Sequence, residues 1–171
     1  ALAGPDASDR ERLAKFIAAE TILFSLQGVP GIYIHSLLGS RNDYYGKTTS
    51  GIPRRINREK LQLSYLEEQL TKDSNRREIF ETLLKRLRIR KQESAFSPVV
   101  GQKMMKLNPS VLSLVRENEK TQEKIYVFIN VSGKEQKIDL TQMKGMNILN
   151  GQQILGNIHL DAWECAWVKQ C

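Results

Sequence analysis

The sequence predicts an α+β protein in which a helical half precedes an antiparallel β half. A helix start signal and apolar residues at helical spacing open the chain, and two further helical stretches follow. From Lys103 onward, short β-rich runs alternate with turn residues such as Asn150-Gly151. The 171 residues, 40% hydrophobic and 26% charged, are typical of a soluble globular chain. They fit neither a disordered segment nor a disulfide-stapled miniprotein.

The first helix is predicted to begin at Ser8, because Ser8 and Glu11 form a Ser-x-x-Glu capping box. Apolar residues then recur at helical spacing as far as Phe24. Residues 22–26 are apolar nearly all round, so this end of the helix is expected to be deeply buried. Gly28 is placed to end the helix.

A continuous apolar run, Val29-Pro30-Gly31-Ile32-Tyr33-Ile34, follows the helix. Continuous apolarity predicts a strand covered on both faces, as in parallel sheets. The rest of the chain offers no second strand of this kind, and an isolated parallel strand would leave unpaired backbone groups at both edges. We therefore expect the chain to be the C-terminal piece of a longer polypeptide, an expectation that a start at Ala1 without Met also favours.

Residues 36–60 show no clear period and are predicted to form a long loop, of a length that usually carries function. The loop leaves the carboxyl end of the predicted strand, where α/β folds place their chemistry. A short helical stretch is expected at Leu61–Leu70. A longer helix, capped by Asp73, Ser74 or Asn75, is expected to run to about Lys91.

The longer helix carries much of the basic excess behind a formal net charge of +7. Its basic residues alternate with apolar residues at helical spacing, so we interpret them as a solvated helix face and not as a phosphate-binding cluster. No aromatic interleaving supports nucleic-acid binding, and no apolar run reaches the roughly 18 residues of a membrane helix. Neither nucleic acid nor a membrane is expected as a partner.

The second half is predicted to be a small antiparallel β-sandwich. Its expected strands are Val111–Val115, Ile125–Ile129, Lys137–Leu140, Met146–Leu149, Ile158–Leu160 and Cys165–Val168. Its expected turns are Asn108-Pro109, Ser132-Gly133, Asn150-Gly151 and Gly156-Asn157. We divide the chain into a domain of residues 1–97 and a β domain of residues 98–171. Trp163 and Trp167 are interpreted as core residues of the β domain and not as a carbohydrate platform.

No metal or cofactor site is expected. Cys165 and Cys171 lie six residues apart with no histidine in a metal-binding spacing, so they predict neither a zinc site nor a redox pair. The small number of cysteines and the absence of an export signal favour the reducing cytoplasm.

The residues around the predicted strand resemble a known family. Gly28-Val29-Pro30-Gly31-Ile32-Tyr33 resembles the Gly-x-Pro-x-x-Tyr stretch that forms the eighth barrel strand in the α-amylase superfamily, where an antiparallel domain follows the barrel. His35–Asp43, Ile56–Leu61 and Leu87–Gln92 narrow the resemblance to sucrose phosphorylases and their relatives. The implied fold is the last helix–strand–helix unit of a (β/α)₈ barrel followed by the β domain, since a complete barrel needs about 250 residues.

The resemblance implies a retaining double displacement, in which a carboxylate takes the glucosyl group of an α-glucoside and a second carboxyl acts as acid and then base. Phosphate then accepts the glucosyl group and gives glucose 1-phosphate. In this superfamily the catalytic carboxylates follow barrel strands four, five and seven, all upstream of Ala1. No catalytic residue is therefore assigned here, and the fragment alone is expected to be inactive. The implied partners are the α-glucoside, phosphate and the upstream barrel segment. The acceptor (fructose, fructose phosphate, glycerate or another polyol) stays open.

Four residues are candidates for substrate binding: Arg58, Asn42, Asp43 and His35. By resemblance, Arg58 binds the donor glucose together with an upstream Asp, because a guanidinium can hold a carboxylate and a hydroxyl at once. Arg54 and Arg55 compete for this assignment. Asn42 and Asp43 resemble a pair that shapes the acceptor side, but such residues are also ordinary turn formers. His35, at the rim of the site, is either catalytic or a hydrogen-bonded structural histidine.

Two other functions stay open. A non-catalytic carbohydrate- or protein-binding β module would bind sugar as the chain alone, and a basic nucleic-acid-binding protein would show salt-dependent affinity. The long loop at residues 36–60 favours the enzyme fragment, because it has no evident purpose in the other two. A helix and a strand shaped for a barrel wall are also expected to expose an apolar patch that drives self-association or repacking.

Overall fold

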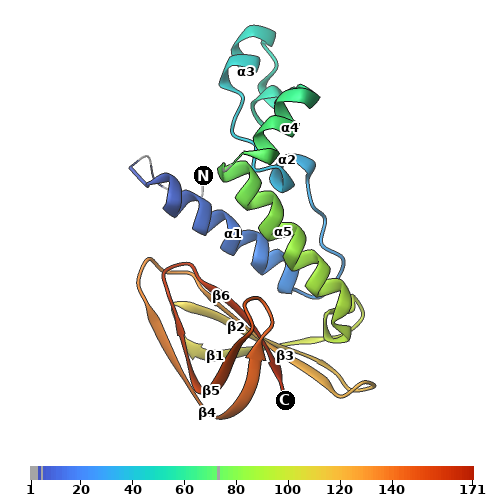
Figure 1. Cartoon of the computed structure of the whole chain (residues 1–171), viewed down its shortest axis with the longest axis vertical. Coiled ribbons are helices and arrows are strands. Elements are labelled where there is room, and N and C mark those ends of the chain that lie inside the picture. Colours follow the sequence, from blue (N-terminus) through green and yellow to red (C-terminus); the bar gives the residue numbers. More distant parts are fainter. Residues whose placement is uncertain (1–3, 5, 73) are drawn as a thin grey trace. The chain divides into compact units, whose positions relative to one another are not determined.

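The computed structural model describes residues 4, 6–72 and 74–171. The helices are α1 (Asp9–Ser25), α2 (Ile34–Leu37), α3 (Tyr44–Ser50), α4 (Leu63–Thr71) and α5 (Asn75–Gln92), with 3₁₀ turns η1 (Pro53–Asn57) and η2 (Ser94–Phe96) (Figure 1). The strands are β1 (Gln102–Asn108), β2 (Val111–Asn118), β3 (Glu123–Asn130), β4 (Gln136–Asn147), β5 (Gln152–Leu160) and β6 (Cys165–Gln170). The chain divides into two compact units, one of Ala1–Pro30 with Lys85–Cys171 and one of Gly31–Leu84.

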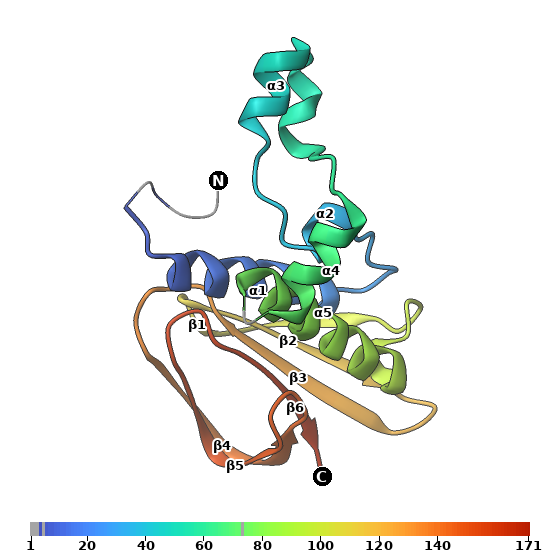
Figure 2. The ribbon, with the colours of Figure 1, turned by 45° about the horizontal axis from the view of Figure 1, so that its top comes forward.

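The β half forms one antiparallel sheet with the strand order β1-β2-β3-β6-β4-β5. The sheet curls strongly, which brings β4 and β5 round toward β2 and β3 (Figure 2). The space inside the curl is filled by buried apolar residues from five strands: Val111, Phe128, Ile138, Ile154, Ile158, Leu160, Ala166 and Val168. The predicted fold class, helices followed by a small antiparallel β domain, is confirmed.

Most of the predicted strands are present. Val111–Val115, Ile125–Ile129 and Cys165–Val168 lie within β2, β3 and β6, which are three neighbouring strands of the sheet. The two runs predicted at 137–140 and 146–149 belong largely to one long strand, β4.

Two details of the β prediction are wrong. Gly156-Asn157 is not a turn but lies inside β5, where four residues of β4 (140–143) stand opposite Gly156 alone. Gly156 has φ +74°, a backbone conformation that favours glycine. Strand β1 was not predicted, because nearly all of its residues are exposed and its sequence shows neither alternation nor a continuous apolar run.

Helix α1 packs on the sheet within the first unit. It begins as predicted, with the Ser8 hydroxyl accepting a hydrogen bond from the Glu11 N–H at 3.1 Å. Its apolar end is buried, and Trp167 Nε1 donates to the Ser25 hydroxyl at 2.9 Å. Trp167 is thus a core residue, as predicted. Trp163 is not: it is half-buried in a turn with φ +64°, and the Lys15 ammonium lies 4.7 Å from its ring centroid.

The interpretation of the basic residues on α5 as a solvated face is wrong for Arg90. Arg90 is buried and donates hydrogen bonds to the carbonyls of Phe24 and Gly28. Arg116, on β2, is also buried and donates to the Ser25 carbonyl at 3.1 Å. Burial, with the charge of Arg90, lowers the pKa of Arg116 to about 10. The two cations occupy the C-terminal end of α1, where a helix leaves carbonyls unpaired and carries negative partial charge.

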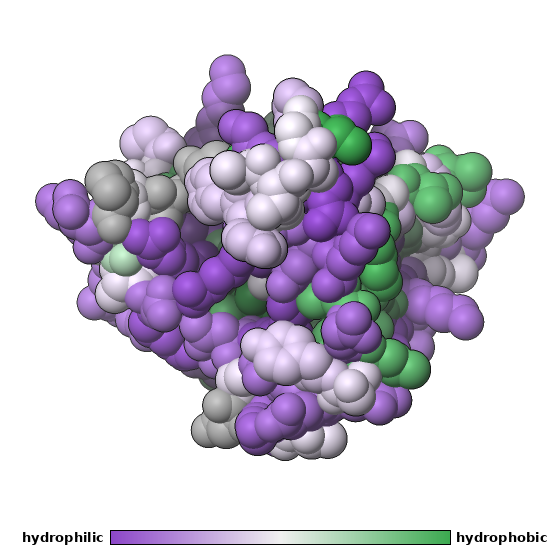
Figure 3. All heavy atoms as spheres, turned by 90° about the horizontal axis from the view of Figure 1, so that it is seen from above, coloured by the Kyte–Doolittle hydropathy of each residue, from purple (hydrophilic) through white to green (hydrophobic). Residues whose placement is uncertain are grey.

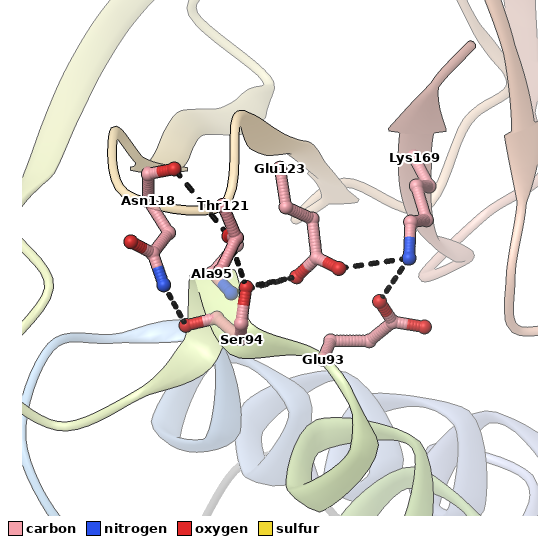
Figure 4. A network of polar contacts seen from close by, with 7 residues as sticks. All are labelled: Glu93, Ser94, Ala95, Asn118, Thr121, Glu123 and Lys169. Carbon is pink, nitrogen blue, oxygen red and sulfur yellow. Dashed lines mark hydrogen bonds and ion pairs between the residues drawn. The ribbon is translucent and has the colours of Figure 1, made fainter.

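A polar network joins η2 and the preceding Glu93 to the start of β3 and the end of β6 (Figure 4). Lys169 Nζ lies 2.6 Å from Glu93 Oε2 and 2.8 Å from Glu123 Oε2, and Glu123 Oε1 accepts from the Ala95 N–H at 2.7 Å. Burial would raise the pKa of Glu123, but the hydrogen bonds from Lys169 and Ala95 outweigh it and hold that pKa below its ordinary value. The hydrogen bonds to Glu123 and Glu93 in turn raise the pKa of Lys169.

The buried strand predicted at residues 29–34 is not formed. These residues lie outside every strand of the described chain, Val29 is 80% exposed and Ile34, at 54%, begins α2. A strand needs neighbours to pair its N–H and C=O groups, and none of the described strands pairs with this segment.

The stretch predicted as an irregular loop, 36–60, contains two helical elements, α3 and η1. The Asp43 side chain caps α3, and Gly51, with φ +67°, ends it. The two helices predicted after the loop are present as α4 and α5. Ser74 Oγ accepts from the Arg77 N–H at 3.3 Å, so Ser74 acts as the predicted cap, while Asp73 lies outside the described residues.

Candidate functional site

Three of the four predicted binding residues, Asn42, Asp43 and Arg58, lie on one excursion of the second unit, whose two limbs are residues 38–43 and 55–59, and His35 lies in α2 just before the first limb. Backbone hydrogen bonds hold the limbs side by side: the Asp43 N–H donates to the Ile56 carbonyl at 2.7 Å. The Tyr33 hydroxyl also donates to the Asn57 carbonyl at 3.2 Å. Asn42 and Asp43 are therefore brought next to the limb that carries Arg58.

Arg76, in the first turn of α5, holds the base of both limbs. Its guanidinium donates to the Leu38 carbonyl at 2.9 Å and to the Ser40 hydroxyl at 3.2 Å on the first limb. It also lies 3.5 Å from Glu59 Oε2 on the second limb. The Arg76 side chain is only 13% exposed, so these contacts are shielded from water.

The first limb lies very close to α5. Gly39 has φ +60°, and a Cβ atom there would stand 2.6 Å from Ile79 Cδ1. The backbone conformation favours glycine at this position, and a larger residue would have to displace the Ile79 side chain. The limb therefore meets α5 one turn after Arg76, and the base of the excursion has little freedom to shift.

His35 lies in α2 and not at the end of a strand, because the strand before it is absent. Its Nδ1 is 3.0 Å from the Ser40 hydroxyl, the same hydroxyl that accepts from Arg76. The Tyr33 ring packs beside it, with centroids 5.2 Å apart. This geometry is that of a hydrogen-bonded histidine, one of the two predicted alternatives.

Both carboxylate oxygens of Asp43 are used inside the chain. Oδ1 accepts from the Gly46 N–H at 2.7 Å, and Oδ2 pairs with the Arg55 guanidinium at 3.1 Å. A Cβ at Gly46 would stand 2.0 Å from Oδ2, so the pair also depends on this glycine. Asp43 thus behaves as a cap and turn former. Because Arg55 is engaged by Asp43, Arg58 and Arg54 are the stronger candidates for binding a ligand.

Arg58 and Asn42 keep polar groups on the surface. Arg58 is exposed at the end of η1, where its N–H donates to the Arg55 carbonyl, and its guanidinium makes no hydrogen bond to another of the described residues. Asn42 is exposed, and its side chain makes one long contact, 3.4 Å to the Tyr44 hydroxyl. The excursion therefore presents a planar cation and an amide from neighbouring limbs, a pair of groups that can bind hydroxyls or an anion.

Sequence reasoning missed Arg76, Ser40 and Glu59, which support this site. One signal was available: a cation in the first turn of a helix is disfavoured by the helix dipole, so Arg76 needed a compensating contact elsewhere. Its partners are 17 to 38 residues away in sequence, so no local pattern could have named them.

Three further observations concern possible binding sites and a membrane. An open depression of about 650 Å³ on the first unit, lined among others by Val99, Gln102 and Lys120, contains none of the four predicted residues. Among the described residues, no group of three or more His, Cys, Asp or Glu side chains is arranged to hold a metal ion. No helix in this part of the chain is long and apolar enough to cross a membrane.

The sequence is similar to curated enzymes. Glucosylglycerate phosphorylase of Escherichia coli (strain K12) is 36% identical over 171 residues, covering 99% of this chain and 30% of the relative. Glucosylglycerate phosphorylase of Allomeiothermus silvanus is 37% identical over 171 residues, covering 98% of this chain and 29% of the relative. The chain thus spans about 30% of the length of the curated relatives that it matches. No protein-family model matches the chain.

Solved structures share the fold. A pullulanase of Anoxybacillus sp. LM18-11, complexed with maltotetraose, aligns with a TM-score of 0.71 at 16% identity, over 96% of this chain and 24% of the pullulanase. An Anoxybacillus α-amylase aligns with a TM-score of 0.70 at 17% identity, over 93% of this chain and 32% of the amylase. These likenesses and the curated relatives confirm the predicted resemblance.

Proposed function

We propose that this chain, which corresponds to the C-terminal part of α-amylase-superfamily glucosyl phosphorylases, belongs to an enzyme that transfers an α-glucosyl group to phosphate by retaining double displacement. The observation that carries the proposal is the similarity to phosphorylases along nearly the whole chain, at 36–37% identity. Both relatives are named for glucosylglycerate, so among the acceptors left open by the sequence, glycerate is the one we favour over fructose.

In this proposal, the nucleophile and the acid/base carboxyl belong to the part of the enzyme that this chain does not span. The carboxylates of the candidate site support that division. Asp43 is paired with Arg55 and caps α3, and Glu59 is paired with Arg76, so both serve the structure of the excursion. The chain supplies binding groups and the wall that positions them.

Arg58 is the donor-glucose ligand in this proposal. Its guanidinium is exposed and free to hold a sugar hydroxyl together with a carboxylate from the remainder of the enzyme. Asn42, on the neighbouring limb, faces the acceptor side, while His35 and Asp43 shape the excursion through Ser40 and Arg55.

The other partner is the remainder of the barrel. Large apolar residues before and along the excursion are exposed, among them Val29, Tyr33, Ile34, Tyr45 and Leu63. Hydrophobic side chains also reach the surface between larger hydrophilic areas on the face shown in Figure 3. Exposure of this extent suits surfaces that pack against another part of a protein.

We keep the division into barrel residues 1–97 and β domain 98–171. We place the enzyme in the cytoplasm, because Cys165 and Cys171 are free thiols.

The upstream coding sequence and a phosphorolysis assay test this proposal together. We expect three acidic residues at the ends of barrel strands upstream of Ala1. The full-length enzyme should release glucose 1-phosphate from glucosylglycerate and phosphate, and the present chain alone should release none. An upstream sequence without those carboxylates, or a folded full-length protein inactive on glucosylglycerate and sucrose alike, would contradict it.

Arg58→Ala tests the site itself. In the full-length enzyme we expect kcat/KM for the glucoside to fall by roughly ten- to hundredfold, because one charged hydrogen bond of about 1.5–3 kcal/mol is lost. Arg54→Ala tests the competing candidate, since Arg54 is exposed on the same 3₁₀ turn, and we expect it to cost less than Arg58→Ala. Unchanged kinetics in Arg58→Ala, or a larger loss in Arg54→Ala, would remove Arg58 from the site.

The alternative function, a β module that binds carbohydrate without catalysis, makes a different prediction. Maltose or glucosylglycerate titrated into the chain alone would then bind with a defined stoichiometry, and the open depression near Gln102 would be the place to map it. Our proposal expects no saturable binding to the chain alone.

A further inference from the structure

We propose that Arg76 is a positioning residue for the candidate glucoside site, acting through Arg58 and Asn42. The inference rests on the proposed function for its kinetic consequences and on the contacts of the excursion for its mechanism. No contact of Arg76 with a substrate is involved.

The argument begins with the place of Arg76. The bases of the two limbs, residues 38–43 and 55–59, are both joined to α5 by hydrogen bonds of Arg76. A guanidinium carries five donors in a fixed plane, so one side chain can hold a carbonyl, a hydroxyl and a carboxylate at once. Arg76 uses this geometry to bind Leu38 and Ser40 on one limb and Glu59 on the other.

The second step is the distance in sequence from these contacts to the binding groups. Glu59 directly follows Arg58, and Ser40 lies two residues before Asn42. A shift at either base therefore passes to a binding group through one or two residues. The bond from the Asp43 N–H to the Ile56 carbonyl, at 2.7 Å, links the limbs farther out, so they would move together.

The third step concerns the orientation of the His35 ring. Its Nδ1 meets the same Ser40 hydroxyl that accepts from Arg76. That hydroxyl has one proton and two lone pairs, so it can accept from Arg76 and still share a hydrogen bond with His35 Nδ1. Arg76 therefore holds in place the hydroxyl that orients the His35 ring.

Substrate binding depends on the geometry of the binding groups, and a misplacement of such a group by about 1 Å can reduce the rate about a hundredfold. We therefore expect Arg76→Gln, in the full-length enzyme, to raise KM for the glucoside and to lower kcat/KM about tenfold. Arg76→Lys keeps the charge but cannot hold both limbs, so it should recover only part of the loss. Arg88→Gln removes the same charge from an exposed position of the same helix and should leave both constants unchanged.

A double-mutant cycle separates this proposal from the proposed function. If Arg76 acts through Arg58, then Arg76→Gln should lower kcat/KM by less than about threefold when residue 58 is already alanine. Additive losses, or a fall in kcat with unchanged KM as expected from a smaller folded fraction, would overturn the positioning role. If Arg58→Ala itself has no effect, the site in the proposed function is wrong and the positioning role falls with it.

A measurement on the chain itself needs no activity. Amide hydrogen exchange at Asp43 and Arg58, whose N–H groups are bonded within the excursion, should become at least several-fold faster in Arg76→Gln and stay unchanged in Arg88→Gln. The ring nitrogen chemical shifts of His35 should also change, because its hydrogen-bond partner Ser40 loses the contact with Arg76. Unchanged exchange together with unchanged His35 chemical shifts would overturn the proposal even if the kinetics agreed.

Discussion

Two apolar runs of this chain look alike in sequence, but one is buried in the sheet and the other is exposed. Val29–Ile34 and Ile125–Ile129 are both short and continuously apolar. The second is the core of β3, where every residue except Tyr126 is buried, whereas the first belongs to no strand and is largely exposed. The difference is in their neighbours: β3 pairs with β2 on one side and β6 on the other.

Each face of β3 is also covered. Phe128 belongs to the cluster inside the curl, and α1 packs on β3 from the other side. A continuous apolar run therefore indicates a segment that needs cover on both faces. It does not supply the neighbours that turn the segment into a strand, and Val29–Ile34 finds none among the described residues.

Removing matched side chains gives the largest expected contrast between the two runs. Ile129→Ala removes a fully buried side chain and should lower the free energy of unfolding of the chain by about 2–5 kcal/mol. Ile34→Ala should change it by no more than about 0.5 kcal/mol, because Ile34 is exposed. Urea unfolding followed by circular dichroism measures both. Equal losses would mean that residues 29–34 are covered in solution.

A charge at Val29 should distinguish the chain alone from the full-length enzyme. In the chain alone, Val29→Asp is expected to leave stability unchanged and to reduce self-association, since it breaks up exposed apolar surface. In the full-length enzyme, where the run would be a barrel strand, the buried carboxylate should cost about 2 kcal/mol or more.

Sedimentation velocity measures the self-association of the Val29→Asp chain, and thermal unfolding measures the stability of the full-length Val29→Asp enzyme. Gln27→Asp, at an exposed polar position two residues earlier, is the control. A monodisperse wild-type chain that binds no hydrophobic dye would contradict the expected self-association. An equal loss of stability in both proteins would contradict the barrel strand.

The smallest expected effect concerns the ion-pair network of Glu123 at the start of β3. The run Val29–Ile34 has no such network among the described residues. The pKa of Glu123 is lowered in the folded chain, so its ion pair stabilises the fold above the unfolded pKa and ceases to do so as pH falls through the folded pKa. The raised pKa of Lys169 acts at the other end: its contribution is full below the unfolded pKa and is lost as pH rises through the folded value.

Unfolding measured from pH 7 to pH 3 tests the network. Wild type should be more stable than Glu123→Gln at pH 7, and the difference should shrink below about pH 4, where a free glutamate becomes protonated. Glu119→Gln, exposed in the neighbouring turn, is the control. A difference between wild type and Glu123→Gln that stays constant with pH would show that the carboxylate charge is not the stabilising feature.

The parts that local sequence could predict are those decided within a few residues. Ser8 caps α1 through the N–H three residues on, and the β-rich runs became strands because their apolar residues could be buried in the same sheet. The resemblance to phosphorylases directed attention to the segment that carries the candidate site. For Asp43 it left an acceptor-side role and a turn-forming role open, and only the structure shows that Gly46 and Arg55 use both of its oxygens.

By itself the sequence determined the two kinds of structure, their order along the chain and the positions of the candidate binding residues, because capping, periodicity and turn chemistry act over a few residues. Only the tertiary structure decided which apolar run became a strand, which arginines were buried at the end of α1, and that Arg76 joins both limbs of the excursion. Those outcomes depend on groups tens of residues apart, whose meeting depends on how the whole chain packs and not on any local pattern.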